Sequence, residues 1–413
     1  MSAAVTNDST SSTSNNYHQN ANNKPWISPK LAFTLVAFSL GQLGDGLNIF
    51  QGIYLVGIGW NEGSVGAALS LMGFTALIVQ TFAGDLVDKT SIDRRRFLAS
   101  ASLVTAFSAS AILFVQEGNT DHMLMYITKV IEGISSSFIG PCLAALTLAT
   151  YGPLHFDAIM ASNIYYGHIG TSVAAVLAGL VSYVFYPNIR YCFLVIVASA
   201  LFAVLFVRYL PQGDQLMGRG FQGKLAIDEE GHVEKFDHDG HVVEVKDALD
   251  ESDKSGSSSD EPAPEAASYF DVFLDQKTGV VCLTGFFFHF ANANVLLVLG
   301  ELMSGDENGE VRRSALGLTA GAIVLAQLTM AAATLAGDRM TLAGVGRKPL
   351  FMAGLITLPI RCLLIILWRD SGDAFLLSTQ VLDGIGGGMF GLIHPYLVAD
   401  IAFGTGRFNV LSK

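Results

Sequence analysis

The chain has 413 residues, of which 51% are hydrophobic and only 15% charged, and its mean hydropathy is +0.45. Soluble domains are about 25% charged, so this composition excludes an ordinary soluble protein. The formal net charge of −12 comes mostly from residues 228–265, which hold fourteen acidic and three basic residues, and no basic patch indicates a nucleic-acid partner.

Long apolar blocks separate short polar loops along most of the chain. A helix needs about 20 apolar residues to cross a hydrocarbon core of roughly 30 Å, and only helices or closed barrels satisfy their backbone polar groups there. The blocks lack the alternation of barrel strands. The sequence therefore predicts an all-α, polytopic membrane protein. Ten spans are expected, at residues 31–56, 64–83, 97–115, 122–149, 160–186, 190–210, 278–300, 314–336, 349–368 and 374–401.

Two hydrophilic segments precede or divide these spans. Residues 1–30 are rich in Ser, Thr and Asn and do not resemble a cleavable signal peptide, so we expect a disordered cytoplasmic tail. Residues 211–277 are acidic and have the composition of a disordered linker, although weak alternation over 224–246 allows a small β-hairpin. The linker divides an N-terminal six-helix bundle at 31–210 from a C-terminal bundle at 278–413.

Lysine and arginine in short loops predict the orientation, because they are enriched on the cytoplasmic side. One set of loops carries eleven of them and the opposite set four. We therefore expect the N-terminus, the linker and the C-terminus in the cytoplasm, and we take the plasma membrane as the expected location.

Two short motifs recur in both halves of the chain. The loop motif Gly84–Lys89 is followed by three arginines, and Gly337–Arg339 is followed by Gly346-Arg-Lys. The span motif Lys129–Gly133 recurs as Gln380–Gly384. The acidic residue of the loop motif and that of the span motif are 44 residues apart in the first half (Asp88 and Glu132) and 45 in the second (Asp338 and Asp383). Two signatures that recur at one spacing predict two homologous halves.

The first loop resembles the Gly-x-Leu-x-Asp-Arg-x-Gly-Arg-Arg signature of the major facilitator superfamily. Gly84, Leu86 and Asp88 match it, Lys89 replaces an arginine, and Ser91 replaces a glycine. The fourth span is similar to the family's Arg-x-x-Gln-Gly pattern, with lysine and glutamate as replacements. The resemblance implies two pseudo-symmetric six-helix bundles. Because the family has twelve spans, we expect the second bundle to be incomplete, with four helices.

The resemblance also implies a cytoplasmic latch between the halves and a central path lined by the first, fourth, seventh and tenth spans. Each of these spans has a polar stripe at helical spacing, whereas the second, third and sixth have almost none. The expected latch residues are Gly84, Asp88, Lys89, Arg94, Arg95, Asp338, Arg339 and Arg347. The expected substrate and coupling residues are Asp45, Asn48, Lys129, Glu132, His289, Asn292, Gln380, Asp383 and His394.

Several path residues have a structural alternative to a functional role. Lys129 and Glu132 are three residues apart, so they can simply pair with each other. Asp45 is protonated, paired with Lys129 or exposed to water. The histidines are proton relays or helix-packing groups. Arg361 lies in the ninth span, which is usually peripheral, and is expected to extend to the membrane interface.

The pattern favours a secondary-active transporter of a small polar solute by alternating access, with protons as the expected coupling ion in symport. Sodium coupling and uniport are the alternatives to proton coupling. A non-transporting sensor or receptor is the alternative function, and a membrane enzyme or a lipid-handling protein on the same scaffold is the third. No nucleophile–base pair, cofactor motif or metal cluster is evident in the sequence, so we expect no enzyme activity, cofactor or metal. The expected partners are the solute, protons and the lipid bilayer, with the protein a monomer.

Overall fold

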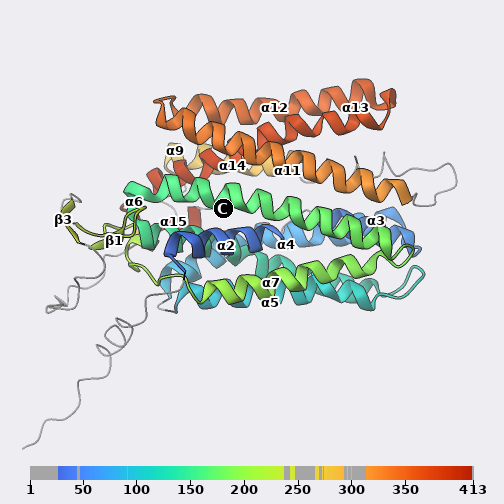
Figure 1. The fold of residues 1–413 in the computed structure, drawn as a ribbon, viewed down its shortest axis with the longest axis horizontal. Coiled ribbons are helices and arrows are strands. Elements are labelled where there is room, and N and C mark those ends of the chain that lie inside the picture. The colour runs from blue at the N-terminus through green and yellow to red at the C-terminus, as the bar shows by residue number, and fades with distance from the viewer. Residues whose placement is uncertain are drawn as a thin grey trace, which may run out of the picture.

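The computed structural model describes most of the chain as a bundle of nearly parallel and antiparallel helices (Figure 1). The described residues are 27–43, 47–90, 92–236, 242–246, 266–268, 272, 274–292, 295, 299 and 313–411. Helices α11, α12, α13 and α14 lie together on one side, α2, α4, α5 and α7 on the other, and α6 runs between them (Figure 1). All but the last four residues of the expected N-terminal tail, 1–26, lie outside the described part of the chain.

Three helices of the first half begin at polar side-chain caps. Ser28 and Asn61 accept hydrogen bonds from the first turns of α2 and α4, and the Asp93 side chain does the same for α5. The first expected span is divided into α2 and α3. The helices are α2 Pro29–Gly41, α3 Asn48–Gly57, α4 Glu62–Lys89, α5 Arg94–Ser110 with η2 Ala111–Phe114, α6 His122–Val184, η3 Ile189–Phe193 and α7 Leu194–Val207.

Helix α6 joins the expected fourth and fifth spans. It has 63 residues, so a straight helix would be roughly 95 Å long, about three times the hydrocarbon core. Gly152 breaks it with φ 65° and ψ 176°, and Pro153 follows. Only glycine adopts this conformation readily, so α6 provides two spans joined without a loop.

The second half contains the remaining expected spans. Among the described residues of the whole chain, seven helices are long and apolar enough to cross a membrane, with α6 counted once. Exposed apolar side chains such as Phe82 and Ile366 cover their outer faces, as expected for contact with lipid. The helices are α9 Gln276–Asn292, α11 Arg313–Leu342, α12 Arg347–Trp368 with η5 Arg369–Ser371, α13 Asp373–Ser378, α14 Gln380–Ala402 and α15 Phe408–Leu411.

The expected disordered linker is folded in its first part. A 3-10 turn, η4 Met217–Arg219, leads to strands β1 Leu225–Ile227, β2 Val233–Phe236 and β3 Val242–Lys246. The strands form an antiparallel sheet in the order β1-β2-β3, which confirms the hairpin over 224–246 and adds a third strand. Composition misled here because a small buried cluster of Met217, Ala226 and Phe236, together with backbone hydrogen bonds to the helix ends, holds an otherwise acidic segment in place. Residues 247–265 lie outside the described part of the chain.

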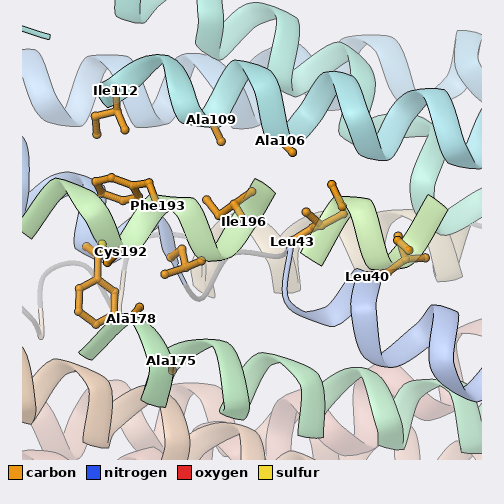
Figure 2. Packing of buried hydrophobic residues seen from close by; sticks show 14 of the residues in the cluster. Leu40, Leu43, Ala106, Ala109, Ile112, Ala175, Ala178, Cys192, Phe193 and Ile196 are labelled. Carbon is orange, nitrogen blue, oxygen red and sulfur yellow. The ribbon is translucent and has the colours of Figure 1, made fainter. Parts of the chain in front are cut away.

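Small residues pack the helices of the first half closely. A Cβ on Gly170 would overlap the backbone oxygen of Phe38, and a Cβ on Gly41 would overlap that of Gly167. Lipid tails are as apolar as leucine, so van der Waals contact of this kind drives helix association in a membrane. Figure 2 shows buried apolar residues of this half, with those of α5 on one side of the segment that carries Phe193 and Ile196 and those of the second half of α6 on the other.

Candidate functional site: buried charges and contacts between the halves

A buried ion pair lies inside the first half. Lys129 Nζ is 2.8 Å from Glu132 Oε2 on the same helix, and Lys129 also donates to Gln51 Oε1 of α3. The Lys129 and Glu132 residues are 1% and 6% exposed. The two expected path residues therefore pair with each other. Gln51 was missed, although it follows Asn48 by three residues and so continues the polar stripe of the first span.

The second half contains a larger buried cluster, centred on Arg361 of α12. Arg361 Nη1 is 2.6 Å from Asp383 Oδ1 and 3.1 Å from Asn292 Oδ1, and Nη2 is 3.1 Å from Gln380 Oε1. The prediction that Arg361 extends to the interface is wrong, since the residue is 0% exposed. Its helix packs tightly on α14 because Gly354 leaves no room for a Cβ. The guanidinium therefore meets the acid rather than lipid.

The two clusters lie at a similar depth. Lys129 is seven residues from the start of α6, Gln380 seven from the start of α13, and Arg361 seven from the end of α12. Seven residues of helix correspond to about 10 Å. All three helix ends are at the end of the bundle opposite to α15 and the sheet (Figure 1). Polar groups of both halves therefore lie in one layer, about 10 Å from that end.

Of the other expected path residues, only the two histidines can be placed. Asp45 lies outside the described residues, as does the side chain of Asn48. His289 and His394 contact the ring of Phe390, with ring centroids 5.4 and 5.3 Å away. The structure thus brings Asn292, Gln380 and Asp383 together and places the two histidines against an aromatic ring.

The first motif loop contacts the end of the chain. Asp88 is 1% exposed and accepts hydrogen bonds from Asn409 Nδ2 at 2.6 Å and from the Val410 backbone N–H at 3.3 Å. A Cβ on Gly84 would overlap the backbone oxygen of Asn409, so the glycine is required for the close approach. The acid lies at the start of α15, where helix N–H groups favour a negative charge.

Charged neighbours extend this contact. Arg407 Nη1 is 2.6 Å from Asp85 Oδ1, and Asp85 also pairs with the expected latch residue Lys89 at 2.8 Å. Arg94 and Arg95 instead bind the chain after α7, donating to the backbone oxygens of Gln215 and Leu210. The arginines therefore tie α5 to the chain that follows α7, and not to the second half.

The second motif loop makes the reciprocal contact with the first half. Arg347 Nη2 is 2.6 Å from Asp157 Oδ2 of α6, and Arg347 also pairs with Asp400. Tyr396 donates its hydroxyl to the Asp157 backbone oxygen at 2.8 Å and to Asp338 Oδ1 at 3.2 Å. Arg339 is exposed. Asp157 was missed because nothing in the sequence marks it as the partner of a loop 190 residues away.

The first part of the linker lies between the same two groups of helices. Gly220 O accepts from the Gly404 N–H at 2.7 Å, and Gly218 O accepts from the Asn409 amide that also binds Asp88. Asp214 N donates to the Ala149 oxygen at 2.7 Å. Residues 213–227 therefore contact α6, α14 and α15 together. We call this end, with both motif loops, the latch end.

One further hydrogen bond crosses between the halves within the membrane. His168 Nδ1 of α6 is 2.7 Å from Gln327 Oε1 of α11. Gln327 is not among the path residues expected from the sequence. Among the described residues, no group of three or more His, Cys, Asp or Glu side chains is placed to hold a metal ion.

The apolar helices and their buried charges define an integral, multi-pass, all-α membrane protein. Comparisons with known proteins identify its family. A sequence profile of the Major Facilitator Superfamily matches residues 31–242. Two uncharacterized MFS-type transporters of Mycobacterium tuberculosis, from strains CDC 1551 / Oshkosh and ATCC 25618 / H37Rv, are 31% identical over 383 residues, 92% of this chain and 80% of each relative.

Solved structures show the same fold at 14–15% identity. The proton:xylose symporter XylE superimposes with a TM-score of 0.61, covering 93% of this chain and 85% of that one. The nucleoside transporter NupG gives 0.58 with 93% and 88%, and the human organic anion transporter MFSD10 gives 0.54 with 93% and 91%. The chain belongs to the major facilitator superfamily, whose members carry small solutes, and it is an MFS-type transporter, not an enzyme.

Proposed function

We propose that the protein is a secondary-active transporter that moves a small polar solute by alternating access. The observation that carries this proposal is the reciprocal pair of contacts at the latch end, Asp88 with Asn409 and Arg347 with Asp157. Each motif loop of one half binds the other half, so the same two loops can close one end of a path and release it. This arrangement favours the state in which the latch end is shut.

The orientation follows from the same loops. The latch end carries most of the short-loop arginines and lysines, so it is assigned to the cytoplasm together with the N-terminus and the linker. The described state is then closed to the cytoplasm. The halves correspond to 31–210 and 278–413, joined by 211–277, and the plasma membrane is the proposed location.

The buried clusters are the proposed solute and coupling groups. Ionisable residues within a membrane are costly and usually mark a pathway. Glu132 and Asp383 each lie beside a cation, Lys129 and Arg361 respectively. Loss or gain of a proton at such a carboxyl changes its pairing, which is the step that proton-coupled symport requires. Sodium coupling and uniport are the alternatives.

Uptake by vesicles tests the proposal. The full chain is reconstituted in liposomes, and accumulation of radiolabelled solutes is measured with and without an imposed proton gradient. Accumulation above the external concentration supports a secondary-active transporter. Saturable binding without accumulation or exchange contradicts it and favours the sensor alternative, in which the site is occupied but the latch never opens.

A further inference from the structure

Each buried ion pair leaves a carboxamide nitrogen without an acceptor. Lys129 and Arg361 take the side-chain oxygens of Gln51 and Gln380. Gln51 Nε2, Gln380 Nε2 and Arg361 Nε then have no hydrogen-bond partner among the described residues. Gln51 is 1% exposed, and both Gln380 and Arg361 are 0% exposed. Buried donors of this kind are unfavourable unless an acceptor reaches them.

The orientation of both amides is determined by their neighbours. Rotating the Gln51 amide would turn its NH2 group toward the Lys129 ammonium, and rotating that of Gln380 would turn it toward the Arg361 guanidinium. Ammonium and guanidinium groups only donate, so each rotation would place donor against donor. The free amide donors are therefore a consequence of the charges beside them.

The charges of the two clusters are already balanced. Lys129 has Glu132 at 2.8 Å, and Arg361 has Asp383 at 2.6 Å. An ionic solute would bring a charge that these clusters cannot pair, and an unpaired charge in an apolar interior is unfavourable. A neutral solute that carries hydroxyl or carbonyl oxygens would satisfy the free donors without changing the balance.

We propose that the free amide donors of Gln51 and Gln380, one in each half and at a similar depth, bind the oxygen atoms of a neutral, acceptor-rich solute. The assignment rests on the proposed transport function and specifies its substrate class, polyols, sugars or nucleosides rather than ions.

Ligand binding to the purified full-length protein tests this assignment. The probes are glycerol, D-xylose, D-glucose and uridine as neutral solutes, lactate and phosphate as anions, and choline and lysine as cations. Binding is measured as the shift in unfolding temperature over a concentration series. We expect a neutral probe to give the largest shift. A shift confined to the anions or cations, or none with the neutral probes, overturns the assignment.

Matched variants locate the effect. Gln51→Met and Gln380→Met keep the length of the side chain but cannot donate, and we expect each to weaken binding of the neutral probe about 3- to 10-fold, as loss of one hydrogen bond does. Gln42→Met is the control, because Gln42 binds Ser199 away from both ion pairs. Unchanged affinity in both variants, or an equal loss in the control, contradicts the assignment.

Vesicle uptake separates this inference from the proposed function. Accumulation of an anion or cation that is insensitive to both variants would leave transport intact and overturn the neutral-solute assignment. Binding of a neutral probe that requires Gln51 and Gln380, without accumulation or exchange, would uphold the site and overturn the transporter proposal.

Discussion

Replacement of Asp88 by asparagine would weaken the contact between the first motif loop and the start of α15. The Asp88 carboxylate is 1% exposed and accepts hydrogen bonds from Asn409 at 2.6 Å and Val410 at 3.3 Å. Hydrogen bonds to a charged group contribute about 1.5–3 kcal/mol and neutral ones about 0.5–1.5 kcal/mol. Asparagine keeps the shape but removes the charge, so the closed latch end should lose about 1–2 kcal/mol, or roughly 5- to 30-fold in its equilibrium.

Distances between spin labels measure that equilibrium. Ile92 and Leu342 are exposed residues of the two halves near the latch end, and labels there report its opening in a background without the four native cysteines. We expect Asp88→Asn to increase the population with the longer distance by this factor and to slow transport while leaving the protein folded. Normal turnover with an unchanged distance distribution would contradict the latch role.

Asp93→Asn provides the matched control for this experiment. Asp93 pairs with Arg95 at 2.5 Å, so its contact lies within the first half. Burial raises the pKa of Asp93, but hydrogen bonds from the Arg95 side chain and backbone lower it more, and the net pKa lies below its usual value. The carboxyl therefore stays ionised at neutral pH, as a control for loss of charge requires. An equal opening in both variants would mean that lost charge, not the latch contact, caused it.

Three further predictions concern other residues. Arg361→Leu leaves Asp383 buried without its cation and should reduce the free energy of unfolding by about 3–5 kcal/mol. Chemical denaturation should show that adding Asp383→Leu recovers part of this loss. No recovery would mean that the two residues are not coupled. Gly220→Ala and Gly231→Ala both introduce a Cβ at positive φ, but only Gly220 has a neighbour within 4 Å, the Ala402 oxygen at 2.9 Å. Only Gly220→Ala should open the latch end in the spin-label assay, and opening by both would assign the effect to backbone strain. If protons drive transport, uptake should rise as external pH falls and collapse with a protonophore. Asp45→Asn should then abolish accumulation of the solute while sparing its exchange. Uptake that does not depend on pH would refute proton coupling.

The sequence predicted the helices well because apolar length is a strong signal in a membrane protein. Each expected span has a helical counterpart, although α6 merges two of them and the first is divided into α2 and α3. The merger was not predictable from hydropathy, since Gly152 and Pro153 are equally typical of a short loop. The non-helical backbone angles of Gly152 turn the chain at that residue, so the two spans are joined by a kink rather than by a longer loop.

The candidate site was predictable where one helix carries the signal and not where two helices meet. Lys129 and Glu132 are adjacent on one face, so their pairing could be expected. The Arg361 partner depends on how α12 packs against α14, and periodicity along one helix carries no information about that. Asp157 and Asn409 were also not predictable, because their partners lie on other helices, 190 and 321 residues away in the sequence.

The two buried ion pairs respond differently to helix movement. Lys129 and Glu132 lie on one helix, so movement between helices leaves their separation unchanged, whereas Arg361 and Asp383 lie on α12 and α14. A Cβ on Gly386 of α14 would lie 3.2 Å from a backbone oxygen of α12, so Gly386→Val should push these helices apart. Double-mutant cycles for unfolding should then show a smaller coupling energy for Arg361 with Asp383 and an unchanged one for Lys129 with Glu132. An equal reduction of both would show that the substitution loosens the whole protein, and unchanged coupling in both would show that the second pair does not depend on the packing of α12 against α14.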